Sequence, residues 1–152
     1  MEEEAPRAEL AVVRTCLVDT GPIVAYLDAN DPAHAEVAPH LDRFAGRLAT
    51  TSAVITESMH LLAADTRGPR LLADFVAASG LEIHDFSHPS ELHGSAELME
   101  RYAQVPMDFA DATLLLLAEG LDVLDLLTLD RRGFAAFRTR AADAMTLLLD
   151  LD

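Results

Sequence analysis

RTCLVDTGPIVAYLD, residues 14–28, is the first strongly apolar stretch of the chain, and its apolar run stops at Asp19. Thr20, Gly21 and Pro22 follow directly. A short apolar run rich in β-branched residues and bounded by Gly-Pro is typical of a buried strand. We therefore predict a strand over 12–19 that ends on a carboxylate. From these residues alone, Asp19 is one half of an aspartic protease dyad, a metal ligand or a turn residue.

Four more short apolar runs alternate with segments of helical periodicity. We expect strands at 48–51, 81–86, 123–129 and 145–149, and helices at 23–27, 31–44, 53–64, 68–79, 90–103, 107–119 and 131–140. Asp31 and Pro32 are typical of a helix start, and Gly80 and Gly120 of helix ends.

Strands that alternate with helices favour a parallel sheet covered on both faces. We predict an α/β fold, a three-layer α/β/α sandwich with a central, mainly parallel sheet. One such domain fills residues 12–152, and residues 1–11 form an acidic tail. The chain is 51% hydrophobic, which excludes a disordered protein.

No apolar run reaches the roughly 18 residues that a membrane-spanning helix needs. The start, MEEEAPRAE, lacks the basic and apolar regions of a secretion signal. Cys16 is the chain's single cysteine, so no disulfide can form within it. We therefore expect a cytoplasmic protein with no membrane partner.

The formal net charge of −15 argues against binding nucleic acid through bulk electrostatics. All the basic residues are arginine, however, and four lie within one ten-residue segment that contains no acid: Arg131, Arg132, Arg138 and Arg140. Arginine binds phosphate through two parallel hydrogen bonds. This segment is either a local anion site or a solvated helix face.

Five acids fall where a parallel sheet gathers its ligands, at the carboxyl ends of its strands. Asp19 and Asp130 end strands, whereas Glu57, Asp108 and Asp111 lie near helix starts. Each has a structural alternative: Asp19 as a turn residue, Glu57 as a solvated helix residue, and the others as helix caps.

Together, these acids point to a bound cation. Two carboxylates about 5 Å apart repel by roughly 3 kcal/mol at an effective dielectric constant of about 20. Such a cluster persists if it takes up protons or a cation. Oxygen ligands favour Mg²⁺ or Mn²⁺.

Four motifs occur in an order that resembles a known family: LVDTGPIVAYLDANDPAH, TTSAVITE, MDFADATLLLLAEGL and LLTLDRRGF. This order is similar to that of the PIN domain, the metal-dependent ribonuclease fold of VapC-type toxins. The resemblance extends from about residue 17 to the end of the chain. It implies the PIN-like sandwich, hydrolysis of RNA phosphodiester bonds with Mg²⁺ or Mn²⁺, a cognate antitoxin and a homodimer.

The resemblance also implies roles for particular residues. Asp19, Glu57, Asp111 and Asp130 match the four acids that hold the metal and carry catalysis. Asp108 is an auxiliary metal ligand. Thr20, Ser52 and Thr128 would support the ligands through hydrogen bonds.

Other classes of protein remain as alternatives. An aspartic protease would be all-β, whereas here helical segments follow the LVDTG motif. A phosphatase with an aspartyl nucleophile commonly has a second Asp two residues on, where this chain has Gly21, and the chain has no lysine. The main alternative is a catalytically weak PIN-fold protein that acts by binding or regulation.

Overall fold

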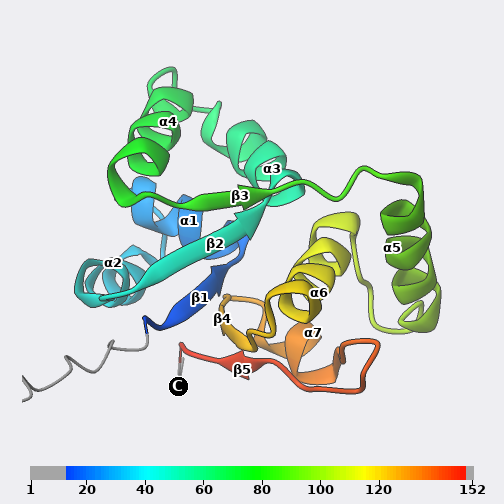
Figure 1. Cartoon of the computed structure of the whole chain (residues 1–152). Coiled ribbons are helices and arrows are strands. Elements are labelled where there is room, and N and C mark those ends of the chain that lie inside the picture. The colour runs from blue at the N-terminus through cyan, green and yellow to red at the C-terminus, as the bar shows by residue number, and fades with distance from the viewer. Residues whose placement is uncertain (1–12, 150–152) are drawn as a thin grey trace, which may run out of the picture.

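A sheet of five strands forms the centre of the computed structural model, which describes residues 13–149 (Figure 1). The strand order is β3-β2-β1-β4-β5, and every neighbouring pair is parallel. The strands are β1 (Thr15–Val18), β2 (Arg47–Thr51), β3 (Glu82–His84), β4 (Asp125–Leu127) and β5 (Thr146–Leu147). The predicted parallel sheet is therefore confirmed.

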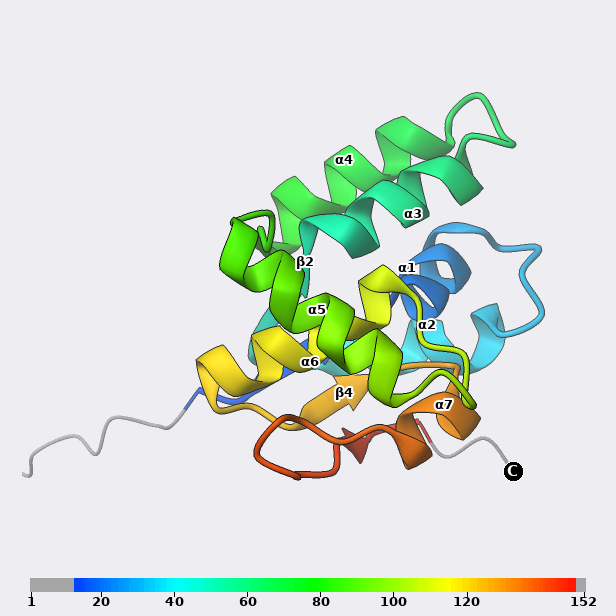
Figure 2. The same cartoon turned by 90° about the vertical axis from the view of Figure 1, so that its right-hand side faces the viewer.

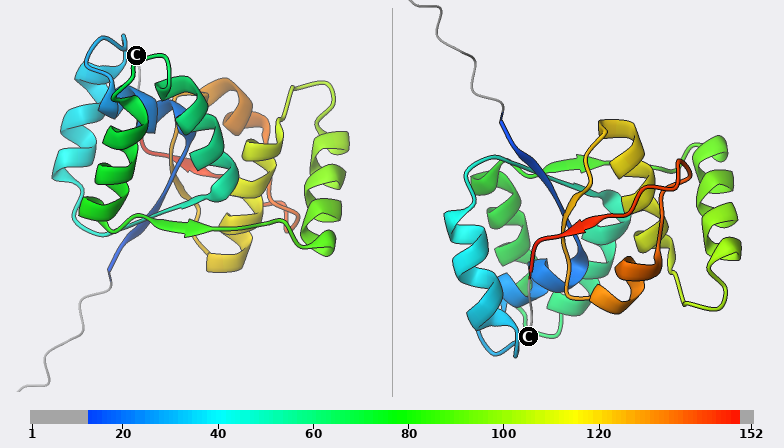
Figure 3. Two further views of the ribbon diagram at one scale, coloured as in Figure 1. Left: turned by 90° about the horizontal axis from the view of Figure 1, so that it is seen from above. Right: turned by 90° about the horizontal axis from the view of Figure 1, so that it is seen from below.

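Helices cover both faces of the sheet, as Figure 3 shows. The connections from β1 to β3 place α1 to α4 on one side, and the connections from β3 to β5 place α5 to α7 on the other. The helices are α1 (Thr20–Leu27), α2 (His34–Arg43), α3 (Ser52–Leu62), α4 (Gly68–Ser79), α5 (Pro89–Arg101), α6 (Phe109–Leu121) and α7 (Arg131–Ala136). The predicted three-layer sandwich is also confirmed.

The central strand β1 is buried because it lies between β2 and β4 and has helices on both faces. Leu17 pairs with Ala49 on one side and with Leu126 on the other, and all three are fully buried. On one face α6 contributes the unbroken apolar run Leu114–Leu117, whose side chains are also buried. A helix that is apolar on nearly all sides belongs in a core.

Helices α1 and α2 each begin three residues away from the predicted start. Helix α1 starts at Thr20 rather than at 23, because Asp19 caps it and Pro22 fits into the first turn. Helix α2 starts at His34 rather than at 31. The Asp31 carboxylate accepts a hydrogen bond from the backbone N–H of Ala33, so Asp31 forms a turn before the helix instead of its cap.

Of the predicted ends of α4, α6 and α7, only that of α4 agrees with the structure. Gly80 ends α4 in the left-handed conformation, at φ 68°, as expected. The prediction for Gly120 is wrong, because α6 continues to Leu121 and Asp122 takes the left-handed conformation at φ 54°. Helix α7 ends at Ala136 instead of reaching 140.

Among the described residues, no helix is both long enough and apolar enough to cross a membrane. The predicted acidic tail, residues 1–11, lies outside the described part of the chain. The boundary of the domain at residue 12 therefore stays a prediction.

Candidate metal and nuclease site

Asp19 is the first residue beyond β1, and hydrogen bonds with Leu127, Thr20 and Thr128 fix its position. Its backbone N–H donates to the Leu127 carbonyl at 3.0 Å, which continues the pairing of β1 with β4. Its Oδ1 accepts from the backbone N–H of Thr20 at 2.8 Å, and its Oδ2 accepts from the Thr128 hydroxyl at 2.8 Å. The residue is only 7% exposed. Asp19 therefore caps α1 and at the same time presents a fixed carboxylate at the end of the sheet.

A pair of buried threonines sets the starts of α3 and α6. The Thr51 Oγ1 accepts from the backbone N–H of Val54, and it lies 2.8 Å from the Thr113 Oγ1. The Thr113 hydroxyl donates to the Ala110 carbonyl, so its proton is used and the Thr51 hydroxyl donates to it. This contact ties α6, near its start, to the end of β2.

The first turn of α6 holds two acids in a capping box. The Asp108 Oδ1 accepts from the backbone N–H of Asp111 at 2.8 Å, and the Asp111 Oδ2 accepts from the backbone N–H of Asp108 at 3.1 Å. The capping role considered for this pair is therefore present. The capping box also keeps both carboxylates at the N-terminus of α6.

Asp130 caps α7, as its structural alternative required. Its Oδ1 accepts from the backbone N–H of Gly133 at 3.0 Å, and its own N–H donates to the Thr128 hydroxyl at 3.0 Å. A Cβ atom at Gly133 would lie 2.4 Å from the Asp130 Oδ2. Residue 133 must therefore be glycine for the carboxylate to keep this position.

All five predicted acids border one cavity of about 470 Å³ at the carboxyl ends of the strands. Glu57 reaches it from α3, and its Oε2 lies 3.2 Å from the Thr20 hydroxyl, which donates to it. The lining residues are Asp19, Thr20, Gly21, Glu57, Leu61, Asp108, Asp111, Leu129 and Asp130. Capping and site formation are thus compatible, because the helix starts converge on the cavity.

The supporting roles predicted for three residues have different outcomes. Thr20 and Thr128 donate to Glu57 and Asp19, respectively. The prediction for Ser52 is wrong, because its hydroxyl donates to Asp85 at 2.7 Å and not to a carboxylate of the cavity. Ser52 begins α3 on the side of β3, where Asp85 follows the strand.

Burial and mutual repulsion raise the pKa of two carboxyls in the cavity. Burial raises the pKa of Asp19 to about 6, against the Thr128 and Thr20 hydrogen bonds, and the charges of Asp108 and Glu57 add to the rise. The pKa of Asp111 is raised as well, first by burial and then by the charge of Asp108. The cavity therefore holds more negative charge than its surroundings stabilise, and a cation or protons would relieve it.

The donor set suits a hard divalent cation, since it consists of carboxylate and hydroxyl oxygens without sulfur or imidazole. Within residues 13–149, however, no three His, Cys, Asp or Glu side chains are arranged closely enough to hold an ion as they stand. The capping contacts of Asp111 and Asp130 compete with a cation for the same carboxylates. Side-chain adjustment in the cavity would have to accompany metal binding.

The sequence and the fold were compared with those of known proteins. No protein family model matches the sequence. The chain is 29% identical over 134 residues to Ribonuclease VapC26 of Mycobacterium tuberculosis, in a match that covers 87% of this chain and 98% of that protein. The predicted resemblance to VapC-type proteins is confirmed.

Solved structures agree with the VapC-type fold. VapC20 of M. tuberculosis, described as a toxin that cleaves the sarcin-ricin loop, superposes with a TM-score of 0.63 at 18% identity, over 73% of this chain and 86% of that one. A toxin-antitoxin complex from Klebsiella pneumoniae gives a TM-score of 0.56 at 20% identity, over 80% of this chain and 92% of that one. At these identities the likeness establishes the fold alone.

Some residues that build this site were not predicted from the sequence. Thr51 and Thr113 position α3 and α6, and Gly133 makes room for the Asp130 carboxylate. A weak signal for each existed: Thr51 ends the TT pair before a helix, Thr113 follows the ADA sequence, and Gly133 lies three residues after a strand-end acid. The two threonine signals do not specify the contact between Thr51 and Thr113, which are 62 residues apart in the sequence.

Replacing Thr128 with valine should raise the pKa of Asp19 further, because the ionised carboxylate loses the hydroxyl that donates to it. A hydrogen bond to a charged group contributes about 1.5–3 kcal/mol, which corresponds to a rise of about one to two pH units. Titration of the carboxyl carbons by NMR measures this value. Thr56→Val, which removes an exposed hydroxyl bonded to the Ser52 carbonyl, is the control. An unchanged pKa in Thr128→Val would contradict the assigned contact.

Proposed function

We propose that this protein is a metal-dependent endoribonuclease, the toxin of a VapBC-type toxin-antitoxin pair. The observation that carries the proposal is the convergence of five carboxylates on one cavity at the carboxyl ends of the strands. The similarity to Ribonuclease VapC26 along nearly the whole length of that protein supports the ribonuclease class. A hydrolase acting on phosphodiester bonds is the chemistry that such a cavity suits.

Asp19, Glu57, Asp111 and Asp130 are the residues proposed to hold Mg²⁺ or Mn²⁺, with Asp108 as an auxiliary ligand. A divalent ion bound there would lower the pKa of a coordinated water and offset charge on the phosphate. It would also reverse the local sign of charge, which allows an acidic protein to accept a phosphate at this point.

The surrounding residues of the chain orient these carboxylates. The Thr128 hydroxyl fixes the direction of the Asp19 carboxylate, and the Thr20 hydroxyl fixes one oxygen of Glu57. Thr51 and Thr113 hold α6 so that Asp111 borders the cavity. Precise placement of this kind is what catalysis by a metal site requires of its protein.

An antitoxin is the expected partner, and the toxin-antitoxin complex from K. pneumoniae, which has the same fold, supports this expectation. We also propose a homodimer and a cytoplasmic location, both from the resemblance and the sequence pattern described above.

A second candidate is a catalytically weak protein that binds through the same cavity. One observation favours it: in the described residues no three acidic or histidine side chains are arranged to hold an ion as they stand. Metal binding separates the two candidates, because a cavity that takes no divalent ion cannot carry the proposed hydrolysis.

The test combines calorimetric titration of the protein with Mn²⁺ and cleavage of a labelled RNA with and without chelator. We expect saturable Mn²⁺ binding, cleavage in Mn²⁺ or Mg²⁺, and loss of cleavage when EDTA is present. Restoring the ion in excess should restore the activity. Cleavage that persists in EDTA would exclude the metal mechanism, and absence of Mn²⁺ binding would favour the second candidate.

A further inference from the structure

Five of the ten arginines that the structure describes are engaged with other groups of the protein. Arg14, Arg47 and Arg140 form ion pairs with Asp125, Glu82 and Glu119, respectively. In the segment 131–140, Arg138 donates to the carbonyls of Ala135 and Phe137, and Arg131 donates to that of Leu149. The four arginines of this segment therefore do not form a common anion site, and Arg132 is the member that remains exposed without a described contact.

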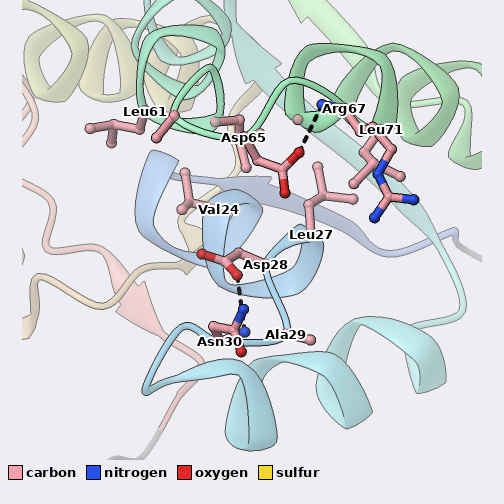
Figure 4. Close-up of a pocket in the computed structure, with 12 residues that line it drawn as sticks. Val24, Leu27, Asp28, Ala29, Asn30, Leu61, Asp65, Arg67 and Leu71 are labelled. Carbon is pink, nitrogen blue, oxygen red and sulfur yellow. Dashed lines mark hydrogen bonds between the residues drawn. The ribbon is translucent and has the colours of Figure 1, made fainter.

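One groove of about 420 Å³ adjoins the acidic cavity on the side of α3 and α4 (Figure 4). Leu61 lines both the groove and the acidic cavity, so the two lie next to each other. Arg67 and Leu71 come from the α4 side, and Asp28 and Asn30 lie across from them after α1. Arg67 is exposed, and its guanidinium makes no ion pair within the part of the chain that the structure describes.

A second groove, of about 500 Å³, adjoins the acidic cavity on the side of α7. Asp130 is the residue that it shares with the acidic cavity. Gln104, Val105 and Pro106 form one wall, and Arg132 lies on the other. This groove therefore also contains an exposed arginine.

The two grooves lie on opposite sides of the acidic cavity. Asp19 ends the central strand β1, whereas Leu61 belongs to the helix that follows β2 and Asp130 follows β4. Strands β2 and β4 flank β1 on its two sides. Figures 1 and 2 likewise place the α3–α4 pair and α7 at opposite ends of the molecule, with α6 between them.

From this arrangement we infer that a single strand of RNA crosses the cavity, with one phosphate at Arg67 and another at Arg132. This inference rests on the proposed function and extends it to substrate binding. The two arginines are positioning residues: they hold phosphates on either side of the one at the acids. The net charge of the chain is −15, and among its described residues these two arginines are the cationic side chains that line the hollows beside the acidic cavity.

RNA fits these three adjoining hollows better than an acidic peptide does. A divalent ion at the carboxylates would neutralise the phosphate that lies between the two arginines. The Arg67 groove also exposes apolar side chains, Leu61 at 49% and Leu71 at 44%. Apolar surface beside a cationic group is typical of sites for unpaired nucleotides, whose bases are free to make contact.

Binding is tested in an Asp19→Asn background, in which the bound strand stays intact for an equilibrium measurement. Fluorescence anisotropy with a 15-nucleotide unstructured RNA compares this protein with versions that also carry Arg67→Gln, Arg132→Gln or both. Each phosphate contact on a single strand contributes about 0.7 to the slope of log K against log salt, which is about fivefold in affinity at 0.1 M salt. We expect a loss of about fivefold for each substitution, and a slope smaller by about 0.7.

Arg43→Gln is the matched control, because Arg43 is an exposed arginine at the end of α2 and lines neither groove. It changes the net charge equally and should leave the affinity within twofold of the background protein. Equal affinities for all of these variants, or no RNA binding at low salt, would overturn the inference. If antitoxin binding falls and RNA binding does not, the grooves belong to a protein partner instead.

Cleavage kinetics with trimmed substrates provide a second readout. Each substitution should raise KM and leave kcat nearly unchanged on a long RNA. Removing the nucleotides on one side of the cleaved bond should abolish the effect of one arginine and preserve that of the other. Effects that do not depend on substrate length would contradict the two phosphate positions. A wild-type protein that binds RNA as expected but never cleaves it would overturn the proposed function and leave this inference standing.

Discussion

Asp111→Asn should lower metal-dependent RNA cleavage by about 100-fold or more, because it removes one negative charge from the proposed metal site. Asp111 borders the acidic cavity, where Asp108 and Asp19 raise its pKa together with burial. Asparagine keeps an oxygen that accepts from the backbone N–H of Asp108, so the capping contact at the start of α6 can persist. The substitution therefore tests the charge without removing the cap.

The measurement is the initial rate on a labelled RNA at saturating Mn²⁺, together with the Mn²⁺ affinity from calorimetry. Circular dichroism and thermal melting establish that the variant is folded. Asp74→Asn is the control, since Asp74 is an exposed acid of α4 that does not line the cavity. Full activity in Asp111→Asn would remove this residue from the site. Equal losses in both variants would point to the overall charge instead of the cavity.

The positions of the acids are the part of the site that sequence patterns predict well. Asp19 and Asp130 follow apolar strands, and in a parallel sheet the ends of such strands lie at one edge. The structure places both at that edge, with Glu57, Asp108 and Asp111 around the same cavity. Local sequence and topology are sufficient here because strand direction decides where the next residue lies.

Contacts between segments distant in the chain are the part that the sequence does not predict. The hydroxyls of Thr51 and Thr113 are 62 residues apart and meet only after β2 and α6 have packed. Ser52 is a case in which the predicted contact does not form. Its position after a strand suggested a contact with a metal ligand, but its hydroxyl donates to Asp85, which follows β3. The direction of a side chain at a helix start depends on the neighbouring strand.

Charge clusters in sequence are also poor guides to charge clusters in space. The arginines of 131–140 are close along the chain, but α7 ends at Ala136 and the following residues take separate partners. Arg67 and Arg132 are 65 positions apart, and the fold places both beside the acidic cavity. The prediction of a helix that runs to 140 is wrong, and for this reason the four arginines do not share one helix face.

Asp19→Asn should stabilise the metal-free protein above pH 7 while leaving its stability near pH 4 unchanged. Burial raises the pKa of Asp19 from 3.8 to about 6, so between these two pH values the folded state keeps a proton that the unfolded chain loses, and above pH 7 the folded state carries a buried charge. The stability that the raised pKa of Asp19 gives the folded state is present below the unfolded-state pKa of 3.8, and it is lost as the pH rises through the folded-state pKa of about 6. Asparagine carries no charge at any pH and avoids this loss.

The size of the effect follows from the shift of about two units, which corresponds to roughly 3 kcal/mol at most. For a chain of this length that is a rise in Tm of about 6–12 °C at pH 8 in EDTA. Thermal melts of wild type and variant from pH 4 to pH 8 measure it, with Asp74→Asn again as the control. Adding Mn²⁺ should stabilise the wild type more than the variant, because a bound cation favours the ionised Asp19. A variant that is less stable than wild type at pH 8 would mean that Asp19 is held ionised by its hydrogen bonds alone, and the cavity would then have no electrostatic need of a cation.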